Sequence, residues 1–129
     1  MMYYKIVNKI NDKYYSPFIN MHEYLIESEC GPVYRTVYPN KNYIRKISPK
    51  EYIINSYVYD DDFLCVYRNF DDILSYIRYY CNNKLPYGWR VFKCDIEKEI
   101  ELPYYLNSVD LPIGTVLVTG VKLLKEVIP

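Results

Sequence analysis

The segment between Cys30 and Lys50 holds the side chains best suited to bind a phosphate-bearing or acidic ligand. It contains five basic residues and no acidic one, with tyrosines placed between them. An arginine can hold a phosphate through two parallel hydrogen bonds, and a tyrosine ring can stack on a base. The pattern suits a nucleotide ligand, a nucleic-acid strand or an acidic protein partner. The candidate ligand-binding residues are Tyr34, Arg35, Tyr38, Arg45 and Lys46.

A solvated loop is the simpler interpretation of the same segment, because the aspartates Asp60–Asp62 would offset its charge. The formal net charge of the whole chain is +0, so no global field attracts nucleic acid. A protein partner or a small ligand therefore fits this chain better than nucleic acid, which stays an alternative.

A second chemical pattern is the alternation of glutamates at Glu97, Glu99 and Glu101. Side chains two residues apart share one face of a strand, so two carboxylates could meet one substrate, as ribosyl transfer requires. A strand, a helix that begins near an acidic pair and paired strands also occur in ADP-ribosyltransferase-like domains. That resemblance implies a divergent transferase with Arg35 on an early strand, but no Ser-Thr-Ser-like strand is present. The simpler interpretation is an exposed strand.

Other catalytic and metal-binding patterns are missing from the sequence. His22 is the only histidine, and the four cysteines form no C-x-x-C pair. There is no G-x-G-x-x-G motif and no Walker loop, and four glycines leave little room for a phosphate cradle. We expect no catalytic residue, no metal site and no cofactor, and we expect that the protein is not an enzyme.

The stretch Asp62–Ile96 must position whatever chemistry the chain performs. Phe63–Tyr67 is apolar and aromatic, which predicts a strand with both faces buried. Asn69 is placed as an N-cap, with two aspartates in the first helical turn. Asn82-Asn83 ends the helix, and Trp89–Ile96 predicts a second strand. The predicted buried stripe of the helix is Phe70, Ile73, Leu74, Ile77, Tyr80 and Cys81.

Strands are also predicted before this unit. Tyr3–Ile10 and Lys13–Phe18 flank Asn11-Asp12, which can adopt the positive φ values of a hairpin turn. His22–Glu29 alternates as a third strand, and Val33–Tyr38 resembles a fourth.

The remaining segments complete the expected order of elements. Ser48 to Glu51 resembles a capping box and predicts a short helix over Pro49–Asn55. Asp60–Asp62 is predicted to be a solvated acidic turn, and Glu97–Glu101 to be the exposed end of the second central strand. Thr115–Val127 predicts the last strand, in which Gly120 indicates a bulge or bend.

These elements predict one α+β domain over residues 1–129. We expect a mostly antiparallel sheet of about five or six strands with one main helix packed on one face. No apolar run approaches the length of a membrane span, and MMYYKIVNK has no apolar core of a secretory signal. A cytoplasmic location, in a host cell or a virion, is the resulting expectation. The 18 tyrosines fit AT-rich codon usage, and a recognition or self-association surface is the alternative.

Four sequence segments resemble a group of small uncharacterised proteins of phages and other DNA viruses. They are YKIVNKINDKYYSPF, FLCVYRNFDDILSYI, WRVFKCDIEKEI and LPIGTVLVTGVKLLKEV. Members share an opening YK-V…YS hairpin, an L-VF…DAL-F strand and helix, a W-CEV strand and a closing P-GT-LAD-VKLL strand. The resemblance implies a viral source and a compact α+β domain, without an assigned activity.

The expected function is therefore that of a non-enzymatic viral accessory protein. It would bind a protein partner or a small, nucleotide-like ligand and so counter a host response. The alternatives are the divergent transferase and the nucleic-acid-binding protein.

Overall fold

The fold was analysed in a computed structural model that describes residues 2–16, 50–102 and 111–129. Strands dominate this part of the chain, which also contains one helix. The elements are β1 (Tyr3–Ile10), β2 (Lys13–Tyr15), β3 (Glu51–Tyr52), β4 (Tyr57–Tyr67), α2 (Phe70–Tyr80), β5 (Trp89–Ile96) and β6 (Thr115–Val127).

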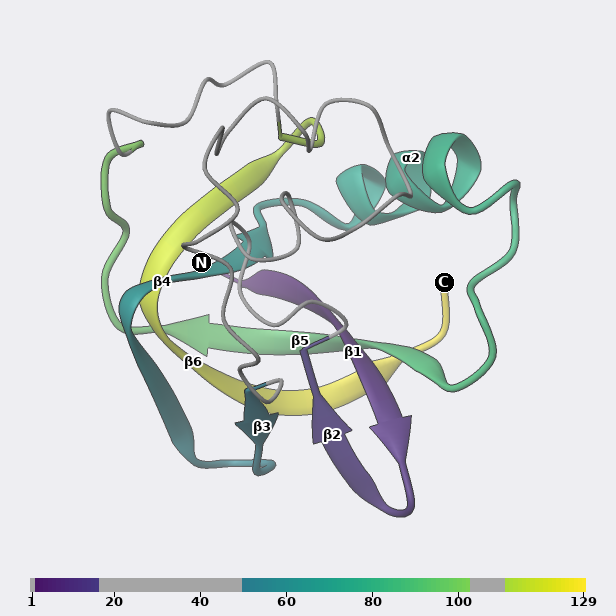
Figure 1. Cartoon of the computed structure of the whole chain (residues 1–129). Helices are drawn as coiled ribbons and strands as arrows, with labels where there is room; N and C mark the ends of the chain where they lie inside the picture. Colours follow the sequence, from purple (N-terminus) through teal and green to yellow (C-terminus); the bar gives the residue numbers. More distant parts are fainter. Residues whose placement is uncertain (1, 17–49, 103–110) are drawn as a thin grey trace, which may run out of the picture.

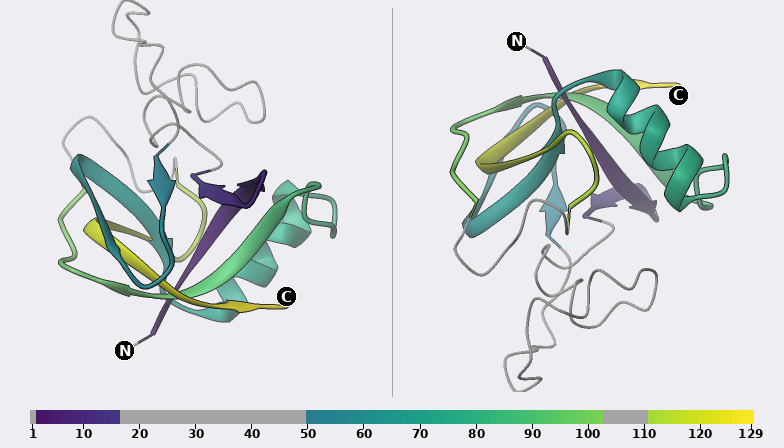
Figure 2. Two further views of the ribbon diagram at one scale, coloured as in Figure 1. Left: turned by 90° about the horizontal axis from the view of Figure 1, so that it is seen from below. Right: turned by 90° about the horizontal axis from the view of Figure 1, so that it is seen from above.

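The six strands of the described residues form one sheet in the order β3-β2-β1-β4-β6-β5. Strand β1 pairs with β5 as well as with β4, so the sheet curls until β1, β4, β6 and β5 close into a ring. Figure 1 shows β6 as a long curved strand, and Figure 2 shows the curl from below and from above. Every ladder is antiparallel. The predicted α+β class, a mostly antiparallel sheet with a helix on one face, is confirmed.

Strands β4 and β5 both run antiparallel to β6, so they run parallel to each other with β6 between them. A parallel pair needs a crossover, and α2 provides it. The helix lies on the outside of the curled sheet, beside β1 and β5 (Figure 2).

Alternation along β5 divides the buried residues into two cores. Phe92 and Cys94 point into the ring, where they pack with residues of β1, β4 and β6. Val91 points outward and packs beneath α2 against Ile73 and Ile77. Both faces of the sheet are therefore buried at this strand, which explains why its sequence is apolar at successive positions.

The predicted hairpin and its turn are confirmed. Asn11 and Asp12 have φ values of 50° and 68°, as the turn requires, and Ile10 pairs with Lys13. The boundaries predicted for the last strand match β6, and those predicted for the second central strand match β5.

The helix begins where predicted, but its buried stripe is narrower. Asp72 Oδ2 accepts a hydrogen bond from the Asn69 N–H at 3.2 Å, which satisfies a donor at the helix start. The buried residues of the helix are Ile73, Tyr76 and Ile77, and Phe70 and Cys81 of the predicted stripe are partly buried against the same cluster. Leu74 and Tyr80 remain 39% and 50% exposed, because the curled sheet offers the helix only a narrow contact. The inclusion of these two side chains in the buried stripe was wrong.

The helix predicted over Pro49–Asn55 is wrong from Lys50 onward. Glu51–Tyr52 is instead β3, which pairs with β2. Tyr52 is 2% exposed and packs inside the ring. Burial of this ring outweighs the local capping pattern, because helix propensity is only a weak preference.

The acidic turn predicted at Asp60–Asp62 is also wrong, since these residues belong to β4. Tyr59 pairs with Gly120, and the next pair along the ladder is Leu64 with Val118. Five residue steps along β4 are therefore matched by only two along β6. The acidic residues therefore lie in a wide bulge within one long strand. The bulge that Gly120 indicated lies in the partner strand β4, directly after Tyr59, the residue that pairs with Gly120.

The strands predicted over His22–Glu29 and Val33–Tyr38 lie outside the described residues. Within the described ranges, no helix is long and apolar enough to cross a lipid bilayer.

Candidate functional site

The ligand-binding residues predicted from the sequence all fall within a range that the structure does not describe. They are Tyr34, Arg35, Tyr38, Arg45 and Lys46. The candidate site in the described part of the chain is formed by other residues, which lie at the rim of the ring.

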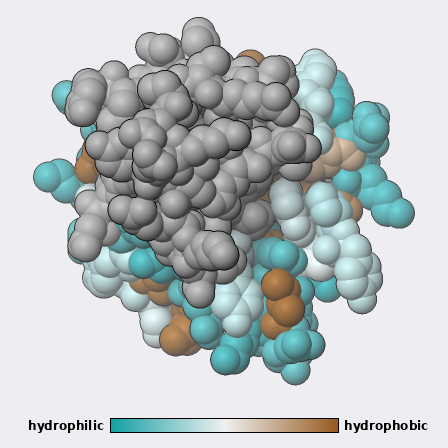
Figure 3. All heavy atoms as spheres, in the orientation of Figure 1, coloured by the Kyte–Doolittle hydropathy of each residue, from teal (hydrophilic) through white to brown (hydrophobic). Residues whose placement is uncertain are grey.

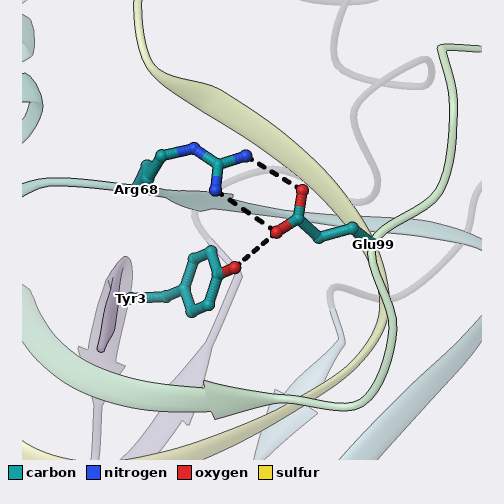
Figure 4. A network of polar contacts seen from close by, with 3 residues as sticks. All are labelled: Tyr3, Arg68 and Glu99. Carbon is teal, nitrogen blue, oxygen red and sulfur yellow. Dashed lines mark hydrogen bonds and ion pairs between the residues drawn. The ribbon is translucent and has the colours of Figure 1, made fainter. Parts of the chain in front are cut away.

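A polar cluster joins three distant segments at this rim. Arg68 directly follows β4, Tyr3 begins β1, and Glu99 comes three residues after β5. The Arg68 guanidinium donates to both carboxylate oxygens of Glu99, at 2.9 Å and 3.3 Å. The Tyr3 hydroxyl donates to the same carboxylate, and the guanidinium lies 5.8 Å from the centre of the Tyr3 ring (Figure 4).

Glu99 is held in place by its backbone as well as by its side chain. The segment after β5 stays beside β6, where the Ile100 N–H donates to the Leu117 carbonyl at 2.9 Å and Glu99 forms an isolated bridge with Val118. The predicted continuation of β5 is therefore an irregular segment that follows the same edge of β6. The solvent exposure predicted for this segment is confirmed at Glu97 and Glu99.

The three side chains change one another's protonation equilibria. The hydrogen bonds from Arg68 and Tyr3 hold the pKa of Glu99 below its usual value. The carboxylate in turn raises the pKa of Tyr3, because ionising the phenol would remove the hydrogen bond and place two negative charges together. The same carboxylate raises the pKa of Arg68. The cluster is thus an ionised pair with a neutral phenol at neutral pH.

This arrangement fixes structure rather than supplying a reactive group. Both oxygens of Glu99 accept hydrogen bonds from Arg68 or Tyr3, and the lowered pKa makes this carboxylate a weaker base than an ordinary glutamate. Glu97 is used separately, since its carboxylate accepts a hydrogen bond from Thr119 Oγ1 at 2.8 Å. The two carboxylates therefore have different partners instead of facing one substrate together.

A groove of about 380 Å³ opens beside the ion pair. Arg68 and Glu99 line one part of it, and most of the remaining wall is aliphatic. The apolar wall includes Ile100, Leu102, Leu111, Pro112, Ile113 and Leu117. Ile113 projects from the turn before β6 and is 80% exposed.

On the face seen in Figure 3, the described apolar side chains occur in small separate areas among hydrophilic ones.

Lys5 is a buried cation that sequence reasoning missed. Its side chain points into the ring and is 5% exposed, and Nζ donates to the Cys65 carbonyl at 2.6 Å. The same Nζ lies 5.3 Å from the centre of the Tyr52 ring. Tyr3, Lys5 and Val7 alternate along β1 and therefore share one face of the strand. Burial of Lys5 could have been predicted if the sequence had indicated which face of β1 points inward.

The thiols near Lys5 are poorly suited to nucleophilic chemistry. Burial raises the pKa of Cys65 and of Cys94 to about 12 in each case. Thiols with such values stay protonated at neutral pH, whereas the thiolate is the nucleophile. These two cysteines therefore act as small packing residues.

Comparison of the chain with protein-family models, with curated proteins and with solved structures gave no match.

Proposed function

We propose that this chain is a non-enzymatic viral accessory protein that binds a protein partner in the host cytoplasm. The observation that carries the binding proposal is the aliphatic groove bounded by the Arg68–Glu99 pair. The viral source is supported by the sequence resemblance described above. Interference with a host response is the role that such a binding protein would serve.

The lining of the groove favours protein side chains over a nucleotide. No described lining residue is aromatic, so a base would find no ring on which to stack. Arg68 is the basic residue of the lining, and it already holds the Glu99 carboxylate. Aliphatic side chains of a partner would fill the groove, and the two charges at its rim would orient polar groups beside them.

The polar cluster also argues for binding instead of catalysis. A general base works best with a pKa near the working pH, whereas the hydrogen bonds from Arg68 and Tyr3 lower the pKa of Glu99. The groove therefore resembles a recognition surface with a fixed charged edge.

The test replaces a groove residue and an equally apolar residue elsewhere. Leu102 lines the groove and is 38% exposed, whereas Ile53 lies in the turn after β3 and is 60% exposed. Proteins captured from a host cytoplasmic extract would be identified, purified and titrated against the wild type, Leu102→Arg and Ile53→Arg by calorimetry. We expect Leu102→Arg to weaken direct binding roughly tenfold or more and Ile53→Arg to leave it unchanged.

Two results would contradict the proposal. One is a purified partner that binds the Leu102→Arg variant as tightly as the wild type. The other is tight binding of a nucleotide, shown by a thermal-shift panel, that is lost in the same variant.

A further inference from the structure

The outer face of α2 has a charge pattern that is complementary to itself. Asp71, Leu74, Ser75 and Arg78 follow one another at the spacing that places side chains on one face of a helix. This face points away from the sheet, since Ile73, Tyr76 and Ile77 pack inward. Asp71 and Arg78 are both exposed, one near each end of the helix.

The positions of these charges fit an antiparallel pair of helices related by a two-fold axis. If the axis passes between Leu74 and Ser75, Asp71 of each copy lies opposite Arg78 of the other. The same axis brings Leu74 of one copy against Ser75 of the second. A small residue at this crossing allows the helices to approach closely, and Leu74 is already 39% exposed.

Projections and recesses flank this face. A hollow of about 440 Å³ borders the helix where Leu74, Arg78 and Lys84 meet. Another of about 220 Å³ lies on the opposite side, between Tyr79 and Ile113. Tyr79 is 73% exposed and Ile113 is 80% exposed, so both project beside this second recess. An isologous interface requires each copy to supply both shapes.

We infer that the outer face of α2 is a homodimer interface, in which Asp71 of each copy pairs with Arg78 of the other. Tyr79 adds apolar area around the helix crossing. The occupant is a second copy because the charges at the two ends of this face are opposite and placed symmetrically about its centre. The inference does not depend on the partner proposed for the groove.

The test uses charge reversal at both positions. Sedimentation equilibrium of the wild type should show a dimer that dissociates on dilution. The Asp71→Arg variant places two arginines at each contact, and the Arg78→Asp variant places two aspartates there. Each variant alone should raise the dimer dissociation constant roughly tenfold or more, because like charges meet twice.

Mixing the two variants gives the decisive measurement. A heterodimer of Asp71→Arg with Arg78→Asp contains two complementary pairs and no like-charge contact. Native mass spectrometry should therefore detect the heterodimer in preference to either homodimer. Circular dichroism of each variant verifies the fold, and Lys125→Asp, an exposed reversal on β6, should leave dimerisation unchanged.

Two outcomes would overturn the inference. One is a wild-type protein that sediments as a monomer up to its solubility limit. The other is a dimer that forms equally well in both single variants, which would place the interface elsewhere. A monomer in which the α2 variants disrupt capture of a different protein would assign the face to that partner.

Discussion

At the scale of single residues, the side chains that fix the rim of the ring are Tyr3, Arg68 and Glu99. Arg68 and Glu99 are 31 residues apart in the sequence, and Tyr3 and Glu99 are 96 apart. No local pattern connects them. Their proximity follows only from the order of the strands, so the cluster could not be predicted from spacing alone.

The Glu99 carboxylate should make the stability of the protein depend on acidity. Its pKa is lower in the folded protein than in the unfolded chain, so its contribution is present above the unfolded value and is lost as the pH falls through the folded value. Glu99→Gln should lower the free energy of unfolding by about 1 kcal/mol or less near neutral pH, because both partners are about 40% exposed.

Urea unfolding at neutral and acidic pH measures this effect. The difference between wild type and Glu99→Gln should shrink in acid, and Glu101→Gln should show no difference at either pH. A difference that stays constant with pH would mean that the carboxylate charge is not what stabilises the cluster.

Lys5 should tolerate loss of its charge better than reversal. A carboxylate at this buried position would face the Cys65 carbonyl, so Lys5→Glu should lower the free energy of unfolding by about 3 kcal/mol or more. Lys5→Met keeps the length of the side chain and removes the charge, so its cost should be less than half as large.

Chemical denaturation of both variants provides the measurement. Lys9→Glu is the matched control, because Lys9 lies on the same strand but is only partly buried. Equal losses for Lys5→Glu and Lys5→Met would indicate that loss of the ammonium contact with the Cys65 carbonyl, and not the introduced negative charge, determines the cost at Lys5.

At the scale of elements, the turn before β6 and the start of α2 depend on one glycine. Gly114 has a φ of +85°, and a Cβ there would lie 2.2 Å from the Asp72 carboxyl carbon. Gly114→Ala should therefore lower the free energy of unfolding by about 2 kcal/mol or more. Backbone strain and the overlap with Asp72 both contribute to this loss.

Gly88→Ala separates the two contributions. Gly88 has a similar φ of +88°, but its nearest neighbour is Asn8 Oδ1 at 3.0 Å, the end of a side chain that can move. Thermal unfolding should show a smaller loss for Gly88→Ala than for Gly114→Ala. Equal losses would mean that Asp72 moves aside without cost.

Elements whose signals are local were predicted well, and elements decided by distant contacts were not. The Asn11-Asp12 turn and the Asn69 cap depend on their own residues, and both were found where expected. The helix predicted at Pro49–Asn55 failed because Tyr52 is drawn into the core by other strands. The acidic turn at Asp60–Asp62 failed because β6 continues opposite these residues and keeps them within β4.

At the scale of the whole molecule, stability should decrease from the ring toward β3. Strand β6 is paired along both edges, whereas β2 and β3 contain three and two residues at one end of the sheet. Hydrogen exchange should therefore be slowest for amides of β5 and β6 and fastest for those that join β2 to β3. Mass spectrometry of proteolytic fragments can check this order.

Comparable protection of β3 and β6 would contradict this expectation. It would mean that the sheet opens as one unit despite the small number of pairs that hold its outer strands.

The position of β6 between β4 and β5 has a consequence for the newly made chain. Both strands leave the ribosome before the segment that they share, so the ring cannot close until β6 has also emerged. Until then the apolar residues of β4 and β5 must be shielded by each other, by β1 or by a chaperone. Since long-range antiparallel pairing is slow, this waiting period is when the protein is most vulnerable to aggregation and proteolysis.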